Sequence, residues 1–546
     1  MRVRGSGAAA VRHPAWVAAL LLVIAFFCAT AIAWVRLDTV PPLWDQSQYL
    51  YESELLYHTL RQQGPAAFLS AFSRVMGSKA PLITALPLPL YALIGESHLT
   101  ARYVNVAFIV LASWYLYRLG TLLAGRGPAL LAVVLLNTFP LVAGMSRQFL
   151  VEYGLMALTI VWMYYLVLWQ RGERRWSPWA LGIVLGFGLL MKVSFPLYVA
   201  APTALVVAHD LVRNRGLRRS TLWSFARVVA LATPIAWPWY SRNWRTVFGF
   251  VLEGGFGFEA RGYGRGEVFS LRTAGTYWLE LVNYAVGGCL AVLLAVVASS
   301  ILYRLARGEN RSGLARTDLL ILLTWWVLPW LALTLAVNKD YRYTLAYLPA
   351  LALLLSAGWN HMTRRWPGAL GLGLVAALSV VNHTYYSFAP GAERADLRVA
   401  GLVLLSNNLQ WAHPPATEDW PNELVHALVA SDAEKSTVAR PVTTVLFSHP
   451  RLNAHNLNYI SVLRESTVSF HTCPFHSPES PSEWAGRIKN ESDYLLTKSG
   501  SPGPEFLNLK NVEILELLRR EGFPFDPIGV IALPDGSEVI AYRRPS

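Results

Sequence analysis

The stretch that decides the fold runs from residue 14 to residue 49 and reads PAWVAALLLVIAFFCATAIAWVRLDTVPPLWDQSQY. Its first part, residues 14–35, contains no charged side chain. A helix of about 20 apolar residues is long enough to cross the hydrocarbon core of a bilayer, which is roughly 30 Å thick. The turn Pro41-Pro42 and the acidic residue Asp45 follow soon after. The stretch therefore predicts a membrane-spanning helix that leads into a polar loop.

Three arginines, Arg2, Arg4 and Arg12, precede this helix, as they would in a signal peptide. Its apolar run is longer than a typical signal-peptide core, and no convincing small-residue cleavage site occurs before Trp34. We therefore expect an uncleaved anchor with the N-terminus in the cytoplasm.

The composition extends the membrane prediction to most of the chain. Of the 546 residues, 54% are hydrophobic and only 15% are charged, against about 25% charged residues in a typical soluble protein. Residues 1–386 contain 33 Lys and Arg against 15 Asp and Glu, whereas residues 387–546 contain 14 against 19. The low charged fraction, with 21 Trp, argues against one large cytosolic enzyme, a disordered protein or a nucleic-acid binder. Because the basic excess lies in the apolar part, it indicates membrane orientation and not a nucleic-acid partner. The three cysteines, Cys28, Cys289 and Cys473, allow no disulfide framework or zinc-type spacing.

Apolar runs of spanning length recur through the first part of the chain. They predict eleven spans, approximately at residues 14–35, 101–122, 128–145, 150–169, 178–191, 194–210, 222–240, 276–303, 318–337, 342–359 and 368–386. Segment 80–95 is also apolar, but it contains Pro81, Pro87 and Pro89. Since proline interrupts helices, we expect this segment to be an interfacial or re-entrant helix.

Basic residues on alternate loops orient these spans. With the N-terminus inside, the N-terminal tail and inner loops contain 18 arginines: Arg2, Arg4, Arg12, Arg118, Arg126, Arg171, Arg174, Arg175, Arg213, Arg215, Arg218, Arg219, Arg304, Arg307, Arg311, Arg316, Arg364 and Arg365. An odd number of spans then places the C-terminal part outside the cytoplasm. We predict a multi-pass cell-membrane protein with a cytoplasmic N-terminus (1–13), a transmembrane domain (14–386) and a soluble extracytoplasmic domain (387–546).

Six cations fall on the opposite, outer side of the predicted spans: Lys79, Lys192, Lys339, Arg102, Arg147 and Arg342. Each alone could be an interfacial residue whose charged head reaches the headgroup region. Together on one face, they favour a site for an anion such as phosphate.

Two acidic residues lie on the same side. Asp45 lies in the first outer loop, after the turn Pro41-Pro42, and Glu152 stands five residues after Arg147, just inside the next helix. Either carboxylate could be a structural ion-pair partner, with Arg147 the candidate for Glu152. The functional alternative is a general base and a polar anchor facing cations that bind a phosphate.

Several short elements occur in a definite order between about residue 15 and residue 386. They are Asp45 before Gln48-Tyr49-Leu50-Tyr51, then Lys79-Ala80-Pro81-Leu82, Gly95-Glu96-Ser97 with Ala101-Arg102, Pro140 with Arg147 and Glu152, Met191-Lys192, and Lys339-Asp340-Tyr341-Arg342-Tyr343 before Leu348-Pro349. In this order they resemble the integral-membrane C-type glycosyltransferases of family 39, which include protein O-mannosyltransferases and lipid A aminoarabinose transferases. The sequence departs from many members at Gln46 and Glu152, where an acidic second residue and Asp are usual.

The resemblance implies a GT-C fold, here a polytopic α-helical membrane protein of about eleven transmembrane helices with a C-terminal soluble α/β domain. It implies transfer of a sugar, with inversion, from a polyprenyl-phosphate-linked donor to an extracytoplasmic acceptor that is a protein, a lipid or a glycan. The residues it assigns are Asp45 and Glu152 as catalytic, and Lys79, Arg102, Arg147, Lys192, Lys339, Arg342 and Tyr343 as substrate-binding. No residue is assigned as a metal ligand, and whether the acidic first loop recruits a divalent ion is left open.

The Gly/aromatic segment from Gly254 to Gly266 replaces any Gly-rich nucleotide loop, and it is either a plain connector or a lid over lipid or acceptor. In the C-terminal part, segments 443–447, 493–497 and 529–533 are strand-like. The last forms a hairpin pattern with 538–542 across Pro534-Asp535-Gly536-Ser537. Its histidines His413, His449, His455, His471 and His476 lack metal-type spacing, which favours ordinary surface residues.

Two other classes of function compete with the enzyme. A polytopic lipid or polysaccharide transporter or flippase would also contain intramembrane charges and broken helices. A non-catalytic scaffold could bind cell-wall material through its soluble domain. Convergence of Asp45, Glu152, Lys79 and Lys192 at the outer face would favour the enzyme, since a transporter should place them near the membrane midplane.

Overall fold

The computed structural model describes residues 14–173, 175–213, 218–262, 270–288, 290–291, 299, 314–362, 366–389, 396–436, 438–473, 477 and 479–545. Some expectations therefore lie outside the described residues. These are the cytoplasmic tail, most of the second half of span 276–303, several inner-loop arginines (Arg174, Arg215, Arg304, Arg307, Arg311, Arg364 and Arg365), His476, and the end of the Gly/aromatic segment.

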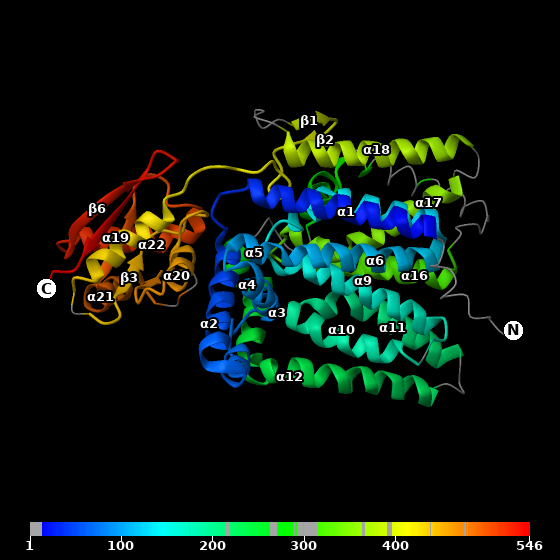
Figure 1. The fold of residues 1–546 in the computed structure, drawn as a ribbon, viewed down its shortest axis with the longest axis horizontal. Coiled ribbons are helices and arrows are strands. Elements are labelled where there is room, and N and C mark those ends of the chain that lie inside the picture. Colours follow the sequence, from blue (N-terminus) through cyan, green and yellow to red (C-terminus); the bar gives the residue numbers. More distant parts are fainter. Residues whose placement is uncertain are drawn as a thin grey trace.

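Long helices lie side by side and form a bundle (Figure 1). They are α1 (Pro14–Leu37), α6 (Val104–Ala124), α7 (Arg126–Thr138), α9 (Val151–Gln170), α10 (Ser177–Met191), α11 (Phe195–Arg213), α12 (Arg218–Phe256), α16 (Arg316–Leu335), α17 (Leu348–Met362) and α18 (Trp366–Phe388). Within the described residues, five helical stretches are long and apolar enough to cross a membrane: Pro14–Leu37, His98–Ala124, Val151–Gln170, Phe195–Val212 and Arg316–Leu335. The polytopic helical fold predicted from the sequence is confirmed.

Helix α9 lies at the centre of this bundle. Of its most apolar stretch, 83% is buried, and it packs against α6, α10 and α11. A helix surrounded by other helices has no solvent-facing side, so it is apolar all round. Tyr153, Met156 and Trp162 are accordingly all buried. The packing around α9 holds the backbone of its first turn, which includes Glu152, in a fixed position.

Short helices cover one end of the bundle. Helix α2 (Trp44–Phe72) runs across this end in Figure 1, and it is followed by α3 (Leu82–Ala85), α4 (Leu88–Ile94) and α5 (His98–Arg102). Within α2, Gly64 has φ +84°, a conformation that suits glycine, and Pro65 follows it, so the helix is kinked there. Pro87 and Pro89 lie at the start of α4, so segment 80–95 forms the two short helices α3 and α4.

Other short elements connect the long helices: α8 (Pro140–Met145), α13 (Phe258–Gly262), α14 (Leu271–Glu280), the π-helix η2 (Leu281–Val286) and the 3₁₀-helix η3 (Tyr341–Tyr347). One difference from the sequence analysis concerns Gly254 and Gly255, which end α12 as helical residues instead of opening a loop. Helix α12 is 39 residues long and so extends well beyond its predicted span.

The C-terminal part forms a five-stranded sheet of order β4-β3-β5-β7-β6. The strands are β3 (Val442–Val445), β4 (Ser469–His471), β5 (Tyr494–Lys498), β6 (Asp526–Ala532) and β7 (Glu538–Arg543). Strand β3 is parallel to β4 and β5, whereas β7 is antiparallel to β5 and β6, so the predicted hairpin is confirmed. We call this part, residues 420–545, the sheet domain.

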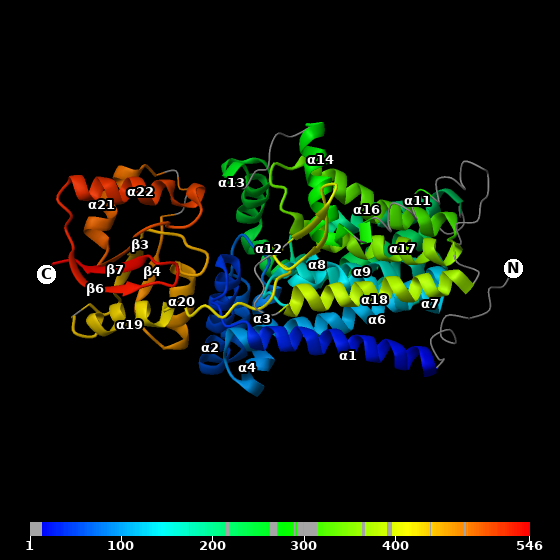
Figure 2. The same cartoon turned by 90° about the horizontal axis from the view of Figure 1, so that it is seen from above.

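Helices cover both faces of the sheet (Figure 2). Leu496 packs with α19 (Asn422–Ala433) and α20 (Ala454–Leu463), whereas Leu495 packs with α21 (Pro481–Glu491) and α22 (Glu505–Arg520). Neighbouring strand residues point to opposite faces, which explains why these two leucines enter different cores. The predicted α/β architecture is confirmed.

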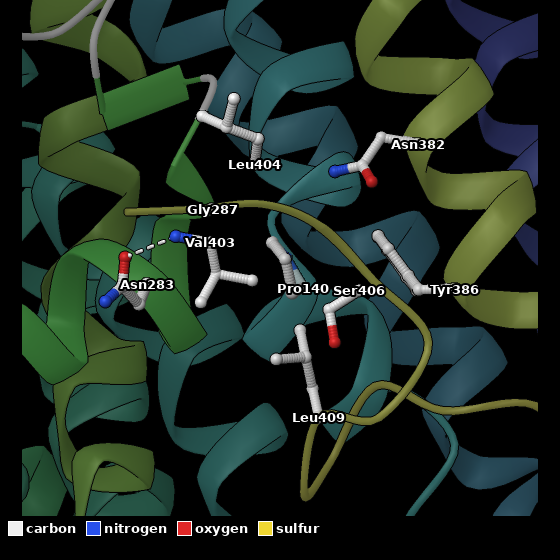
Figure 3. A pocket seen from close by; sticks show the side chains of 9 residues that line it. All are labelled: Pro140, Asn283, Gly287, Asn382, Tyr386, Val403, Leu404, Ser406 and Leu409. Atoms are coloured by element: carbon white, nitrogen blue, oxygen red, sulfur yellow. Dashed lines mark hydrogen bonds between the residues drawn. The ribbon is translucent and has the colours of Figure 1, made fainter. Parts of the chain in front are cut away.

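Between bundle and sheet domain, the chain forms a β-hairpin of β1 (Asp396–Val399) and β2 (Leu402–Ser406) beside α18 (Figure 1). The Val403 N–H donates to Asn283 Oδ1 at 3.0 Å, which fixes the hairpin to η2. A small pocket lies at this junction (Figure 3), and its lining is Pro140, Asn283, Gly287, Asn382, Tyr386, Val403, Leu404, Ser406 and Leu409.

The sheet domain packs on the end of the bundle that α2 covers, through α20 on α2. Asn456 Nδ2 donates to the Pro42 carbonyl at 2.8 Å, and Trp44 Nε1 donates to Ser448 Oγ at 3.1 Å. The first residues of α1 lie at the opposite end of the bundle (Figure 1). The loop after the first span is therefore enclosed between the bundle and the sheet domain.

Candidate active site

Helix ends bring the predicted charged residues together. Asp45 lies in the first turn of α2, directly after the Pro41-Pro42 turn, and Glu152 lies in the first turn of α9. Lys192 is the C-cap residue of α10, directly after Met191, and Arg342 lies in the first turn of η3. Each of these side chains therefore starts from a fixed backbone position at the end of the bundle that faces α2.

Asp45 is paired with two cations. Its Oδ1 lies 2.9 Å from Lys79 Nζ, and its Oδ2 lies 3.3 Å from a terminal guanidinium nitrogen of Arg342. Lys79 also donates to Gln48 Oε1 at 2.9 Å, one turn after Asp45 on α2. Burial alone would raise the pKa of Asp45, but the charges of Lys79 and Arg342 outweigh this effect and hold its pKa well below the usual range.

Glu152 forms the second half of the cluster. Its Oε1 accepts from Lys192 Nζ at 2.8 Å and lies 3.7 Å from Arg342 Nε. The Glu152 side chain is only 5% exposed, against 37% for Asp45. Its other oxygen, Oε2, is buried and has no hydrogen-bond partner among the described residues. Glu152 therefore keeps one acceptor position free for a ligand.

Arg342 connects the two carboxylates. In addition to its contacts with Asp45 and Glu152, Arg342 pairs with Asp340, whose Oδ2 lies 2.8 Å from Arg342 Nε. Three cations (Lys79, Lys192 and Arg342) thus face three carboxylates (Asp45, Glu152 and Asp340). We call these six residues the charge cluster.

Aromatic rings border the cations of the charge cluster. Lys192 Nζ lies 4.5 Å from the centre of the Tyr343 ring, and the Arg342 guanidinium carbon lies 5.5 Å from it. The Tyr343 carbonyl accepts from the Tyr198 hydroxyl at 2.8 Å, which fixes the backbone of η3. Lys79 Nζ lies 5.7 Å from the ring of Tyr49. Cation–π attraction of this kind restrains the ammonium groups without neutralising them.

The other predicted cations bind elsewhere. Arg102 forms a buried ion pair with Asp38 at 2.8 Å. Arg147 is buried, donates to Ser387 Oγ and lies 5.4 Å from the Trp34 ring, and among the described residues it forms no ion pair with Glu152. Lys339 is 1% exposed and donates to the Ala336 carbonyl at 2.6 Å.

Arg147 nevertheless differs from Arg102. Its Nε and one terminal nitrogen are buried and have no hydrogen-bond partner among the described residues. The pocket in Figure 3 includes Pro140 of α8, the short helix that ends before Arg147, but no charged side chain lines it, so the charge cluster remains the stronger candidate for chemistry.

Sequence reasoning misses three residues at this site. It treats Asp340 only as a neighbour of Lys339, but Asp340 pairs with Arg342 instead. Gln48 stands in the element Gln48-Tyr49-Leu50-Tyr51, where its spacing of three residues from Asp45 is an available signal. His455 is expected among ordinary surface histidines, but burial and the charge of Lys79 lower its pKa to about 4. It reaches the cluster from α20, and no local pattern could have indicated that.

The arrangement suits displacement of a phosphate-linked group. Three fixed cations offer electrostatic stabilisation for a phosphate, and two carboxylates with different exposure offer a base and an anchor. Because the three cations are paired with the three carboxylates, an entering phosphate would compete for the cations and free a carboxylate.

Part of the chain matches a known protein family. The family described as Dolichyl-phosphate-mannose-protein mannosyltransferase matches residues 78–240. A comparison of the sequence with curated proteins finds no match.

Solved structures resemble nearly the whole chain. Over 97% of this chain and 98% of the other, it is similar to ArnT from Cupriavidus metallidurans bound to undecaprenyl phosphate, with 14% identity and a TM-score of 0.57. The chain is also similar to the oligosaccharyltransferase of Archaeoglobus fulgidus, over 96% of this chain and 74% of the other, with 11% identity and a TM-score of 0.51. A third similar structure is the arabinofuranosyltransferase AftD from Mycobacteria. The similarity covers 96% of this chain and 40% of AftD, with 13% identity and a TM-score of 0.50.

The structural matches establish the GT-C fold, and the family match adds the enzyme class, so both expectations drawn from the resemblance are confirmed. The chain is a multi-pass membrane glycosyltransferase with the GT-C fold.

Proposed function

We propose that the chain transfers a sugar, with inversion, from a polyprenyl-phosphate-linked donor to an extracytoplasmic acceptor. The observation that carries this proposal is the charge cluster, in which Arg342 bridges Asp45 and Glu152 while Lys79 and Lys192 flank them. The similar ArnT structure contains undecaprenyl phosphate, which supports a polyprenyl phosphate as the lipid part of the donor.

The donor phosphate would bind to Lys79, Lys192 and Arg342. Lysine ammonium groups are compact charges suited to single phosphate oxygens, whereas arginine offers paired N–H donors. The rings of Tyr49 and Tyr343 already hold these cations in place. The positive charge would be pre-oriented for the phosphate that leaves, which is where catalysis needs it.

Asp45 would be the general base. It is the more exposed of the two carboxylates, so an acceptor hydroxyl can reach it, whereas Glu152 is enclosed. As Asp45 takes the hydroxyl proton, the acceptor oxygen bonds to the anomeric carbon on the face opposite the phosphate. The bond between that carbon and the phosphate oxygen breaks, and the electron pair leaves with polyprenyl phosphate. Glu152 would anchor the sugar through its free oxygen.

Donor binding would also activate the base. In the structure, Lys79 and Arg342 depress the pKa of Asp45 and so weaken it as a base. When a phosphate takes over these two cations, the pKa of Asp45 moves back toward its ordinary value. The carboxylate then becomes a stronger base only when the donor is in place, which limits unproductive proton transfer.

This model predicts the pH dependence of the enzyme. Because the pKa of Asp45 is depressed, the carboxylate stays charged as the pH falls below its ordinary pKa of about 3.9. Removing a neighbouring cation in Lys79→Met should raise that pKa and move the acid limb of kcat/KM to higher pH. The measurement is a pH profile of kcat/KM, with Lys339→Met as the matched control. Identical acid limbs for Lys79→Met and the wild type would contradict the pairing.

The transfer assay that tests the function uses the purified full-length protein and a panel of synthetic polyprenyl-phosphate sugars. We expect at least one donor to yield polyprenyl phosphate, detected by mass spectrometry, in step with a glycosylated acceptor. If every donor in a panel of hexoses and pentoses stayed intact with envelope extract as acceptor, the proposal would fail.

We also propose that the N-terminus is cytoplasmic and that the part after residue 386, including the sheet domain, is extracytoplasmic. The arginines of the predicted inner loops support this orientation. Domain boundaries at 1–13, 14–386 and 387–546 follow from it.

Thiol labelling tests this orientation. In a background without Cys28, Cys289 and Cys473, we expect Ser482→Cys to react with an impermeant thiol reagent in intact spheroplasts and Asn214→Cys to react only after lysis. The exposed Ser482 belongs to the sheet domain, whereas Asn214 lies in a predicted inner loop. Labelling of Asn214→Cys before lysis would reverse the proposed orientation.

A transporter or flippase is the alternative function. Its charges should lie near the membrane midplane, between helices. Here Asp45, Glu152, Lys192 and Arg342 all start from helix ends beside α2 and the sheet domain. This placement favours the transferase.

A further inference from the structure

A second group of charged residues lies farther along α2, outside the charge cluster. It comprises Glu54, His58 and Glu96, and one potential ligand atom from each lies within 4.8 Å of the other two. Glu54 and His58 are four residues apart, so they share one face of α2. Glu96 comes from the segment between α4 and α5. Two separate parts of the chain therefore aim ligand-type side chains at one point.

Glu54 is the informative member of this group. Its side chain is fully buried near the neutral Tyr91 hydroxyl, and within the described residues neither carboxylate oxygen forms a hydrogen bond of ordinary length and angle. A buried carboxylate without partners is costly unless a proton or a cation compensates its charge. The position therefore calls for a positive group that the neighbouring side chains do not supply.

The surrounding charges do not fill this need. His58 Nε2 lies 3.0 Å from Glu96 Oε2, and Arg61 lies 3.8 Å from Glu96 Oε1. Arg61 is 69% exposed, so its charge is largely solvated. From the sheet domain, Tyr459 of α20 interacts electrostatically with both Glu54 and Glu96, but its buried hydroxyl is neutral and adds no positive charge. Two carboxylates and an imidazole thus converge without an equivalent cation.

We propose that Glu54, His58 and Glu96 bind one divalent metal ion, with Zn²⁺ preferred. One imidazole and two carboxylates supply three ligands, and a water completes the tetrahedral set that zinc adopts. Imidazole also favours zinc over Mg²⁺ and Ca²⁺, which prefer sites built entirely from oxygen. The ion would join α2 to the segment between α4 and α5, directly beneath α20 of the sheet domain. Its role is structural, and it shares no residue with the charge cluster.

Metal binding by the full-length protein tests this proposal without any transfer assay. The protein is purified in detergent through a tag that contains no histidine, stripped with a chelator, and equilibrated with Zn²⁺ against a competing chelator of known affinity. Bound zinc per chain is measured by plasma mass spectrometry. We expect one zinc per wild-type chain. Losing a residue that only supports a metal ligand typically lowers metal affinity about 10–100-fold. The variants Glu54→Gln, His58→Gln and Glu96→Gln should each lose more affinity than that.

Two matched controls isolate the site. Glu52→Gln changes a glutamate of the same helix outside the group, and His471→Asn changes an exposed histidine of the sheet domain. Both should bind zinc like the wild type. Zinc should also raise the unfolding temperature of the wild type but not that of Glu54→Gln. Glu54→Gln keeps the side-chain shape and removes a buried charge, so it should fold even if His58→Gln does not.

The proposal is overturned if the wild type retains no more zinc than Glu54→Gln, which would mean that Glu54 is protonated and needs no metal. It is equally overturned if zinc binding survives all three substitutions, or if the wild type prefers Mg²⁺ or Ca²⁺ to Zn²⁺. Failure of this zinc-binding test would not contradict the proposed transferase function, because no outcome of the test depends on a sugar donor.

Discussion

Replacing Asp45 with Asn is expected to reduce the transfer rate by about 10²–10⁴-fold, the usual cost of removing a general base. The amide has nearly the same shape as the carboxylate but cannot take the acceptor proton. Asp45 is the exposed carboxylate of the charge cluster, and its position in the first turn of α2 is fixed by the adjoining Pro41-Pro42 turn. The rate should therefore fall through loss of kcat, while the protein stays folded.

The measurement is single-turnover transfer from one polyprenyl-phosphate sugar, with Glu52→Gln as the control on the same helix. Gel filtration and the unfolding temperature report whether Asp45→Asn stays folded. Wild-type turnover by the Asp45→Asn variant would remove this residue from the mechanism and leave Glu152 as the candidate base.

The cations of the charge cluster should differ from Lys339 in their contribution to donor binding. We expect Lys79→Met and Lys192→Met to weaken donor binding by about 10–150-fold, which corresponds to the about 1.5–3 kcal/mol of a hydrogen bond to a charged group. Lys339→Met should have a much smaller effect, because Lys339 donates to the Ala336 carbonyl and does not join the cluster. Methionine keeps the apolar stem of lysine and removes only the charge.

The apparent affinity for one donor, measured with an inactive Asp45→Asn background to prevent turnover, separates these cases. Wild-type affinity in both Lys79→Met and Lys192→Met would show that the outer lysines do not bind the phosphate. A large effect of Lys339→Met alone would point to a different anion site.

Several features of this site follow directly from the sequence. Long apolar runs predict spanning helices because little else can satisfy the backbone in a membrane. The alternation of arginine-rich loops then places Asp45, Glu152, Lys79 and Lys192 on one side, and the structure brings these four together. Their convergence was predictable because helix ends on one side of a bundle are confined to a thin layer.

Other features depend on contacts that no local pattern encodes. Helix α2 mixes polar and apolar residues without a clear periodicity, since it is covered by both the bundle and the sheet domain. The bond from Asn456 to the Pro42 carbonyl joins residues that are 414 positions apart. Sequence reasoning groups Arg102 and Arg147 with the other outer cations because only their side of the membrane is readable. Their actual partners, Asp38 and Ser387, depend on how the helices pack.

The most direct test of the central claim is an experimental structure of the protein with bound polyprenyl phosphate. The account predicts the phosphate within hydrogen-bond distance, about 3.2 Å or less, of at least two of Lys79, Lys192 and Arg342, with Lys79 displaced from Asp45. A phosphate bound instead beside Arg147 or Arg102, or between helices near the membrane midplane, with the ion pairs of Asp45 and Glu152 unchanged, would contradict it.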